Sequence, residues 1–361
     1  MKIAFLLLVL FHGLIHVLGF VKGFELSEVK ALTLPVSKPQ GVVWLVAAFL
    51  FLTYGVLYLL NSRYAWLPGL VAVVLSQLLI VLFWKEAKFG TIPNGIVLVV
   101  SLVSLGYYSF QRSIAQETAQ LLAKSVPVDK RTVMDKDLVA LPHPVQRWLR
   151  NCGALGKPFT SYGKVTQMAE MQMKPEQDHW LTATAIQYTT LDTPAFIWTV
   201  DVQMNRLLSF QGRDKYVEGK GEMLIKMNSL FPVVKERGEK LDEGTLQRYL
   251  GEMVWFPSMA LRSFITWEQQ GENTARATMT YKGISGSGTF YFNSNGDVVK
   301  FSALRYKGNE AEAKRYLWEM DVLGYKTFEG INVPAKLSST WRLEAKDWTW
   351  LKMEVTAIEY Y

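Results

Sequence analysis

The first 110 residues contain four long apolar stretches without a single Asp, Glu, Lys or Arg. They cover residues 3–21, 41–60, 66–84 and 93–110. An α-helix rises about 1.5 Å per residue, so roughly 20 residues are needed to cross the hydrocarbon layer of a membrane. A helix on a soluble protein needs a polar face, and these stretches have none. The pattern predicts four transmembrane helices in a domain that comprises residues 1–110.

Charged and aromatic residues flank these stretches, as is typical of membrane helices. The first stretch has no small-residue cleavage site before Lys22, which favours a retained helix over a signal peptide. The two loops opposite the termini hold five basic residues near the helix ends, against four on the side of the termini. This small excess favours termini outside the cytoplasm. We therefore expect a multi-pass membrane protein whose remaining chain lies on the extracytoplasmic side.

Composition excludes several other classes of protein. The chain has 39 Lys and Arg against 32 Asp and Glu. Seven of the basic and three of the acidic residues lie in residues 1–110. Residues 111–361 therefore hold 32 basic and 29 acidic residues, a net charge of only +3. Nucleic acid is therefore not an expected partner. The single cysteine, Cys152, excludes an internal disulfide and a cysteine-rich zinc module. We expect no metal and no cofactor.

The rest of the chain divides into a linker and a β-rich domain. Residues 111–135 are polar with helical spacing of apolar side chains, which predicts a juxtamembrane linker helix that ends at Val126-Pro127. Residues 136–361 form the β-rich soluble domain, which opens with a short helix after Pro144. Strands are predicted at 164–174, 180–189, 196–204, 206–211, 216–225, 275–281, 286–293, 297–306, 315–323, 325–328, 334–343 and 349–360.

Turn signals and one helical insertion complete the predicted fold. Asn295-Gly296-Asp297, Gly324 and Glu329–Asn332 mark turns. Residues 241–254 have helical spacing, and Asp242 can cap the helix. Short strands at roughly ten-residue intervals favour an antiparallel meander. The predicted fold class is an α-helical membrane bundle joined to an antiparallel β-rich α+β domain, a curved sheet or half-barrel with a helical insertion.

Two histidines lie within the first apolar stretch. His12 and His16 are four residues apart and therefore share one helix face. A metal or haem site is one interpretation, since polar groups in a membrane are often functional. The other apolar stretches supply no further histidine or acidic ligand. We favour hydrogen bonds across the bundle to partners drawn from Ser76, Gln77, Thr53 or Tyr54.

The predicted helical insertion carries the main candidates for a ligand pocket. Arg248 and Glu252 are four residues apart, which suits either a surface ion pair or an active-site pair; we favour the ion pair. The aromatic corner after them and one later tryptophan complete the pocket candidates, which are Arg248, Glu252, Trp255, Phe256, Pro257 and Trp267. No catalytic residue can be named, because residues 283–288 match neither a nucleophile elbow nor a phosphate loop.

Several segments together resemble a bacterial family of uncharacterised proteins with a domain of unknown function. They are Leu141-Pro142-x-Pro144-Val145-x-Arg147-Trp148-Leu149, Gly221-Glu222-Met223-x-Ile225-Lys226, Arg248-Tyr249-Leu250-x-Glu252-x-x-Trp255-Phe256-Pro257, and Gly330-x-x-Val333-Pro334 followed by Trp341. The family tyrosine after Arg147 is Trp148 here. The resemblance covers about residues 141–361 and implies no activity, and the four-helix module before it resembles one attached in only some members. More remotely, the domain is similar to the lipoprotein-carrier half-barrel, which implies a curved sheet around a lipid cavity.

These observations give three functional hypotheses. The favoured one is a protein of the bacterial inner membrane whose β-domain binds an apolar or lipid-like ligand next to the bilayer, with membrane lipid as partner. Tryptophan and methionine are abundant in residues 136–361, and methionine adapts to irregular apolar ligands. One alternative is a membrane enzyme or redox protein that uses Arg248 and Glu252 or His12 and His16. The other is a scaffold that docks a protein. We favour a protein that is not an enzyme.

Overall fold

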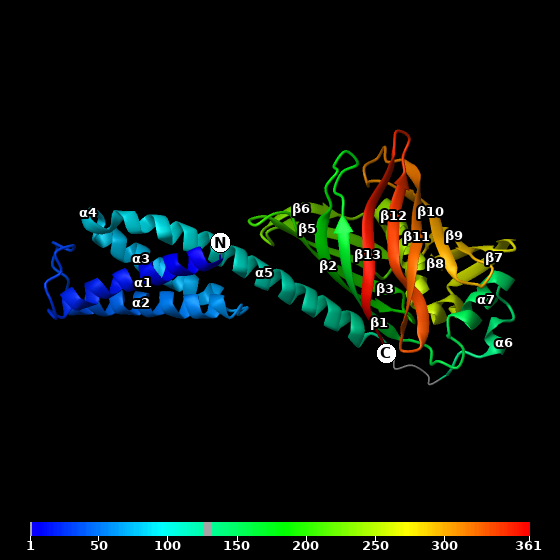
Figure 1. The fold of residues 1–361 in the computed structure, drawn as a ribbon, viewed down its shortest axis with the longest axis horizontal. Coiled ribbons are helices and arrows are strands. Elements are labelled where there is room, and N and C mark those ends of the chain that lie inside the picture. Colours follow the sequence, from blue (N-terminus) through cyan, green and yellow to red (C-terminus); the bar gives the residue numbers. More distant parts are fainter. Residues whose placement is uncertain (1, 126–130) are drawn as a thin grey trace. The chain divides into compact units, whose positions relative to one another are not determined.

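A computed structural model describes residues 2–125 and 131–361 of the chain (Figure 1). It divides into two compact units. The first, the helical unit, comprises the chain up to Ser113 together with Asn228–Leu230; the second, the β unit, comprises Ile114–Met227 and Phe231–Tyr361.

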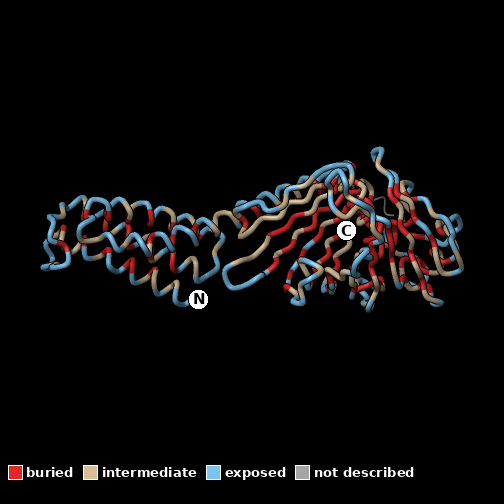
Figure 2. The backbone as a smooth tube through the Cα atoms, turned by 90° about the horizontal axis from the view of Figure 1, so that it is seen from above, coloured by how far each residue is buried: buried red, intermediate tan, exposed pale blue. Residues whose placement is uncertain are grey.

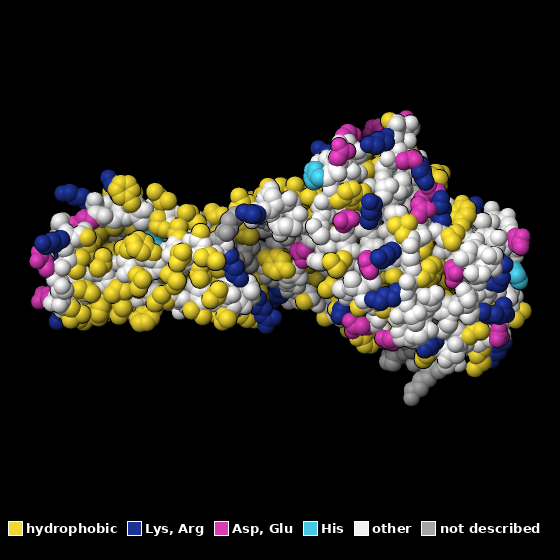
Figure 3. Space-filling view, viewed as in Figure 1, with side chains coloured by type: hydrophobic (Ala, Val, Ile, Leu, Met, Phe, Trp, Pro, Cys, Tyr) yellow, Lys and Arg dark blue, Asp and Glu magenta, His cyan; other side chains and the backbone are white. Residues whose placement is uncertain are grey.

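The helical unit is built from long apolar helices. Its helices are α1 (Lys2–Gly23), α2 (Lys38–Leu59), α3 (Trp66–Leu82), α4 (Trp84–Ala87) and the first part of α5 (Thr91–Ala123), with a 3₁₀ turn at Lys88–Gly90. Small residues allow α1 and α2 to pack closely: a Cβ on Gly19 would lie 2.2 Å from the Trp44 ring. Many large apolar side chains face outward, among them Phe11, which is 69% exposed, and Phe49, which is 60% exposed (Figure 3). Such a surface suits a lipid environment better than water.

Three helical segments are long and apolar enough to cross a membrane. They are Lys2–Gly23, Lys38–Leu59 and Trp84–Ala123. The remaining predicted span, at residues 66–84, corresponds to α3, which is equally apolar but has only 17 residues. The helical unit is thus compatible with membrane anchoring through three helices.

The predicted linker helix at 111–135 continues directly from the fourth apolar stretch. Helix α5 runs without interruption from Thr91 to Ala123, so the apolar stretch and the polar stretch after it form one helix. The physical reason is that residues 111–123 keep helical propensity and spacing, and no Gly or Pro interrupts them. The predicted break at Val126-Pro127 lies outside the described residues.

The β unit is one curved antiparallel sheet of 13 strands. Its strand order is β6-β5-β4-β3-β2-β1-β13-β12-β11-β10-β9-β8-β7. The strands are β1 (Tyr162–Met171), β2 (Leu181–Thr190), β3 (Ala195–Gln203), β4 (Ser209–Val217), β5 (Lys220–Met227), β6 (Phe231–Glu236), β7 (Ile265–Gly271), β8 (Thr274–Tyr281), β9 (Ile284–Phe292), β10 (Val298–Tyr306), β11 (Arg315–Phe328), β12 (Ile331–Arg342) and β13 (Asp347–Tyr360). Except where β1 meets β13, neighbours in the sheet are neighbours in the chain. The predicted curved sheet with a helical insertion is therefore confirmed.

The helical elements of the β unit are short, apart from the insertion. They are α6 (Asp135–Leu138), α7 (His143–Asn151), α8 (Glu239–Gly251) and the 3₁₀ turns η2 (Glu252–Trp255) and η3 (Pro257–Leu261). Helix α7 begins next to Pro144, as predicted. The insertion packs on one face of the sheet, against β4, β5 and β8–β10. Figure 2 shows the buried segments concentrated along the strands.

Four details of the predicted β unit are wrong. Strands β6 and β7 were not predicted. Gly324 is not a turn, because β11 continues through it with a shift in register against β12. The turn between β4 and β5 lies at Glu218-Gly219, both with positive φ, rather than before Tyr216. Helix α8 begins at Glu239 after Gly238, so Asp242 is not its N-cap; its carboxylate instead accepts a bond from the backbone N–H of Gly221, at 2.7 Å.

Candidate functional site

Arg248 lies at the centre of a buried polar cluster between α8 and the sheet. Its Nε donates to Glu252 Oε1 at 2.7 Å, and its other nitrogens donate to Asp214 Oδ2 at 2.8 Å and Gln187 Oε1 at 3.1 Å. The side chains of Arg248 and Glu252 are only 16% and 9% exposed. The expected i,i+4 pair is therefore present, but it is buried rather than at the surface.

The sheet supplies the other half of this Arg248 cluster. Gln187 on β2, Trp198 on β3 and Asp214 on β4 are direct cross-strand neighbours. Their side chains share the face that α8 covers, and the Arg248 guanidinium lies 4.7 Å from the centre of the Trp198 ring. Such stacking on an aromatic face stabilises a cation that has left water.

Every carboxylate oxygen of Glu252 in the Arg248 cluster has a partner. Its Oε1 accepts from Arg248, and its Oε2 accepts from Gln187 Nε2 at 2.7 Å. Burial raises the pKa of Asp214, while the neighbouring Arg248 opposes that rise. Burial also opposes the charge on Arg248, yet Glu252 and Asp214 raise its pKa overall. These charge-assisted hydrogen bonds hold α8 on the sheet.

A second arginine extends the polar region along α8. Arg305 on β10 donates to the carbonyl of Gly244 at 2.8 Å and lies 4.6 Å from the centre of the Trp318 ring. Burial, together with the charge of Arg248, lowers the pKa of Arg305 to about 10. Trp318, Trp341 and Trp348 lie side by side on β11, β12 and β13. Tryptophans distant in the sequence thus form one row beside Arg305.

The aromatic corner after α8 is packed into the core. Trp255 and Phe256 are each 1% exposed, and Pro257 is also buried. Trp255 Nε1 donates to the carbonyl of Pro334 at 3.0 Å. The ring of Phe256 fills the space beside Gly163, where a Cβ would come within 2.1 Å of it. Trp267, the last pocket candidate, is half-buried and donates to the carbonyl of Ala260.

The face of the sheet under α8 has a covered and an uncovered part. Tyr216 and Gly221 lie beneath the helix and are buried. The side chains that continue the same face of β4 and β5 away from the helix are apolar and only half-buried: Phe210, Met223, Ile225 and Met227. We call these four residues the apolar floor. The alternation of a regular antiparallel pair places all of them on one face.

Two cavities described in the β unit have polar walls. One, of about 490 Å³, lies beside α8 and is lined by Gln247, Arg276 and Ser287 among others. The other, of about 470 Å³, is lined by Lys215, Lys220, Glu222 and Asp242 among others. Charged side chains thus line both cavities, whereas the apolar floor carries none.

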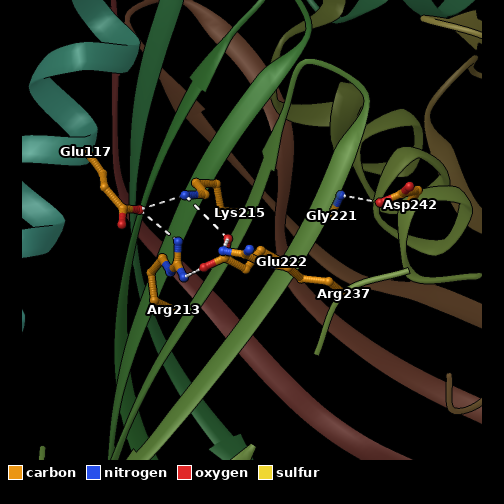
Figure 4. A network of polar contacts seen from close by, with 7 residues as sticks. All are labelled: Glu117, Arg213, Lys215, Gly221, Glu222, Arg237 and Asp242. Carbon is orange, nitrogen blue, oxygen red and sulfur yellow. Dashed lines mark hydrogen bonds and ion pairs between the residues drawn. The ribbon is translucent and has the colours of Figure 1, made fainter. Parts of the chain in front are cut away.

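The last turns of α5 contact the face of the sheet opposite to the one that α8 covers (Figure 4). Glu117 Oε2 accepts from Arg213 at 2.8 Å and from Lys215 at 3.2 Å. Glu222 also pairs with Arg213 and with Arg237. Although burial opposes it, the hydrogen bond from Arg213 keeps the pKa of Glu222 below its usual range. This network could not be predicted from the sequence, because its members come from α5, β4, β5 and Arg237, two residues before α8.

Glu117→Gln is expected to loosen residues 114–123 from the sheet. Arg213 is 3% exposed, so losing one of its two carboxylate partners leaves charge poorly compensated. Amide exchange in this segment should become about fivefold faster, which corresponds to roughly 1 kcal/mol. Hydrogen-exchange mass spectrometry tests this, with Lys124→Gln as the control, since Lys124 makes only an exposed contact of 3.8 Å to Glu218. Equal exchange in Glu117→Gln and wild type would contradict the assignment.

His12 and His16 form hydrogen bonds within the helical unit. His12 Nε2 bonds to Asn94 Oδ1 at 2.9 Å, and His16 Nε2 bonds to Ser76 Oγ at 2.9 Å. Ser76 was among the expected partners, whereas Asn94 was not. Among the described residues, neither Thr53 nor Tyr54 bonds to a histidine, and no group of three or more His, Cys, Asp or Glu side chains is placed to hold a metal.

A curved antiparallel sheet with a helix packed on one face places the β unit among half-barrel proteins. The chain belongs to a family of unknown function, DUF6544, whose model matches residues 131–353. This confirms the family resemblance noted in the sequence. A search of curated proteins finds no match.

Two solved structures align with this chain at 8% sequence identity. A LolA superfamily protein from Nitrosomonas europaea aligns over 60% of this chain and 93% of its own, with a TM-score of 0.34. A beta-barrel-like protein of a domain of unknown function, DUF1849, from Brucella abortus aligns over 56% of this chain and 98% of its own, with a TM-score of 0.27. Likeness at this level carries no argument about function.

Proposed function

We propose that the protein is anchored in a membrane by four helices and binds an apolar or lipid-like ligand on the apolar floor of its β unit. The fourth helix is α3, whose 17 residues extend about 26 Å, close to the thickness of a hydrocarbon layer. Outward-facing Val74, Leu78 and Val81 on α3 are each more than half exposed. Three residues of this kind on one short helix favour contact with lipid over contact with water.

The observation that carries the ligand proposal is the incomplete burial of the apolar floor. Phe210, Met223, Ile225 and Met227 continue a face whose other part is closed by α8. Half-buried apolar side chains gain roughly 25 cal/mol for each Å² that a ligand removes from water. Two of the four are methionines, which adjust to chains of irregular shape. An acyl chain laid along β4 and β5 would complete the burial.

A photocrosslinking experiment on the full chain in cells tests the ligand proposal. A benzoylphenylalanine at Ile225 is expected to capture a lipid, seen by mass spectrometry as a mass added to the peptide that contains β5. The control position is Ile186 on β2, which is 40% exposed and lies on the opposite face from Ala185 and Gln187. Lipid adducts at both positions, or at neither, would refute a ligand site on the apolar floor.

A further inference from the structure

The ladder between β9 and β10 ends before the strands themselves do. Its last paired residues are Thr289 and Ser302, whereas β9 begins earlier, at Ile284, and β10 continues to Tyr306. In these further residues β9 pairs with β8 and β10 pairs with β11, but the two are not paired with each other in the described chain. They leave an opening in the sheet between residues 284–288 and 303–306, which we call the β9–β10 wedge.

The side chain of Gln247 bridges the β9–β10 wedge from α8. Its Nε2 donates to the carbonyl of Ser287 at 3.3 Å and to that of Leu304 at 3.1 Å. A strand residue directs its N–H and C=O to the same side, so the N–H groups of Ser287 and Leu304 also point into the wedge, where the ladder no longer joins them. Gln247 is 3% exposed, and its Oε1 is buried without a partner among the described residues. The wedge therefore holds one buried acceptor beside two backbone donors.

The cavity of about 490 Å³ opens at this wedge, and residues of both strands and of α8 line it. Two arginines, Arg276 on β8 and Arg315 on β11, are among the lining residues. Arg315 donates to Glu243 Oε2 at 2.7 Å, and Glu243 is the only acidic residue in the described lining. Arg276 is exposed and has no ion pair among the described residues, although Glu268 is its cross-strand neighbour. Two cations and one carboxylate give the lining a net charge of +1.

We infer that this cavity binds an organic phosphate whose alcohol part carries a free hydroxyl, as in glycerol phosphate. Arg276, Arg315 and the two backbone N–H groups are donors from several sides, which suits the tetrahedral oxygens of a phosphate. The hydroxyl would donate to Gln247 Oε1, an acceptor that is costly to leave unpaired and that a bare anion would meet lone pair to lone pair. The site is separate from the apolar floor on β4 and β5, so its failure would leave the proposal for that floor untouched.

Calorimetric titration of the full chain in detergent tests both parts of the inferred ligand. The probes are glycerol 3-phosphate, propyl phosphate, which lacks the hydroxyls, and glycerate, which carries a carboxylate in place of the phosphate. Glycerol 3-phosphate is expected to bind at least about tenfold more tightly than either of the others, because each of them forfeits one class of hydrogen bond. Equal affinity for propyl phosphate or glycerate, or no saturable binding of glycerol 3-phosphate, would each overturn the inference.

Three variants locate the binding to the wedge. Arg276→Gln removes the unpaired cation and should weaken binding of glycerol 3-phosphate at least about tenfold. Arg206→Gln makes the same change at another exposed arginine, outside the cavity, and should leave the affinity unchanged. Leu304 lines the cavity and is 54% exposed, so Leu304→Trp can fill the opening without disturbing the core and should abolish saturable binding. Unchanged affinity in Arg276→Gln or in Leu304→Trp would overturn the inference.

The same headgroup chemistry occurs in a soluble phosphate and in phosphatidylglycerol. The titration with glycerol 3-phosphate is therefore repeated in nanodiscs of phosphatidylcholine, with and without phosphatidylglycerol. Weaker apparent affinity in the discs that contain phosphatidylglycerol would identify a lipid headgroup as the ligand, since it competes for the site. Equal affinity in both kinds of disc would identify a soluble phosphate, and both results accord with the inference.

Discussion

Replacing Arg248 by methionine is expected to lower the free energy of unfolding of the β unit by about 3 kcal/mol. The substitution leaves the carboxylates of Asp214 and Glu252 in a largely buried place without their cation. Breaking a buried ion pair costs about 3–5 kcal/mol. We expect a value at the lower end, because the Arg248 side chain is still 16% exposed to solvent. Urea unfolding of the full chain, followed by near-ultraviolet circular dichroism, measures the change.

The loss of stability in Arg248→Met should depend on pH and on the charges of Asp214 and Glu252. Burial already raises the pKa of Asp214, and without Arg248 the charge of Arg213 is the main influence left to oppose that rise. When the pKa of an acid is higher in the folded state than in the unfolded state, the folded state takes up its proton first and gains stability as the pH falls. The destabilisation by Arg248→Met should therefore shrink as the pH is lowered from neutral. The triple variant Arg248→Met, Asp214→Asn, Glu252→Gln should recover much of the stability. A loss independent of pH and without recovery in the triple variant would argue against this account.

Trp255→Ala is expected to destabilise the β unit by about 3–5 kcal/mol. The ring is 1% exposed, and its removal leaves both a cavity and an unpaired carbonyl at Pro334. Trp255→Phe should cost less, because it refills most of the space. Trp180→Ala is the matched control, since Trp180 is half-buried and mainly stacks under Lys352, an interaction worth roughly 1 kcal/mol. Similar melting temperatures for Trp255→Ala and Trp180→Ala would show that the aromatic corner does not anchor the core.

Regular alternation made most of the sheet predictable from the sequence. Strands such as β1 and β2 alternate buried and exposed positions along nearly their whole length. β6 could not be predicted, because apolar and polar residues do not alternate in Phe231-Pro232-Val233-Val234 and because proline argues against a strand. β7 escaped because Glu268, Gln269 and Gln270 give it a polar second half. β6 and β7 are the two edge strands of the sheet, where only one neighbouring strand constrains the side chains.

The partners of Arg248 could not be predicted, although Arg248 itself was a candidate. Spacing along a helix reveals Glu252, which lies one turn away. Asp214 and Gln187 come from other strands, and only the register of β2, β3 and β4 brings them together beneath the helix. The same holds for Asn94, which reaches His12 from another helix. Local patterns in a sequence carry no information on such distant pairings.

The sheet does not close into a barrel, so β6 is an edge strand beside the apolar floor. Strand β6 forms a ladder with β5 alone, whereas each strand of a closed barrel has two such neighbours. Separating β6 from β5 would break their ladder of backbone hydrogen bonds and uncover the edge of β5 beside Ile225 and Met227. If the proposed ligand binds on the apolar floor, a covalent cross-link between β5 and β6 is expected to slow its exchange while the floor itself stays unchanged.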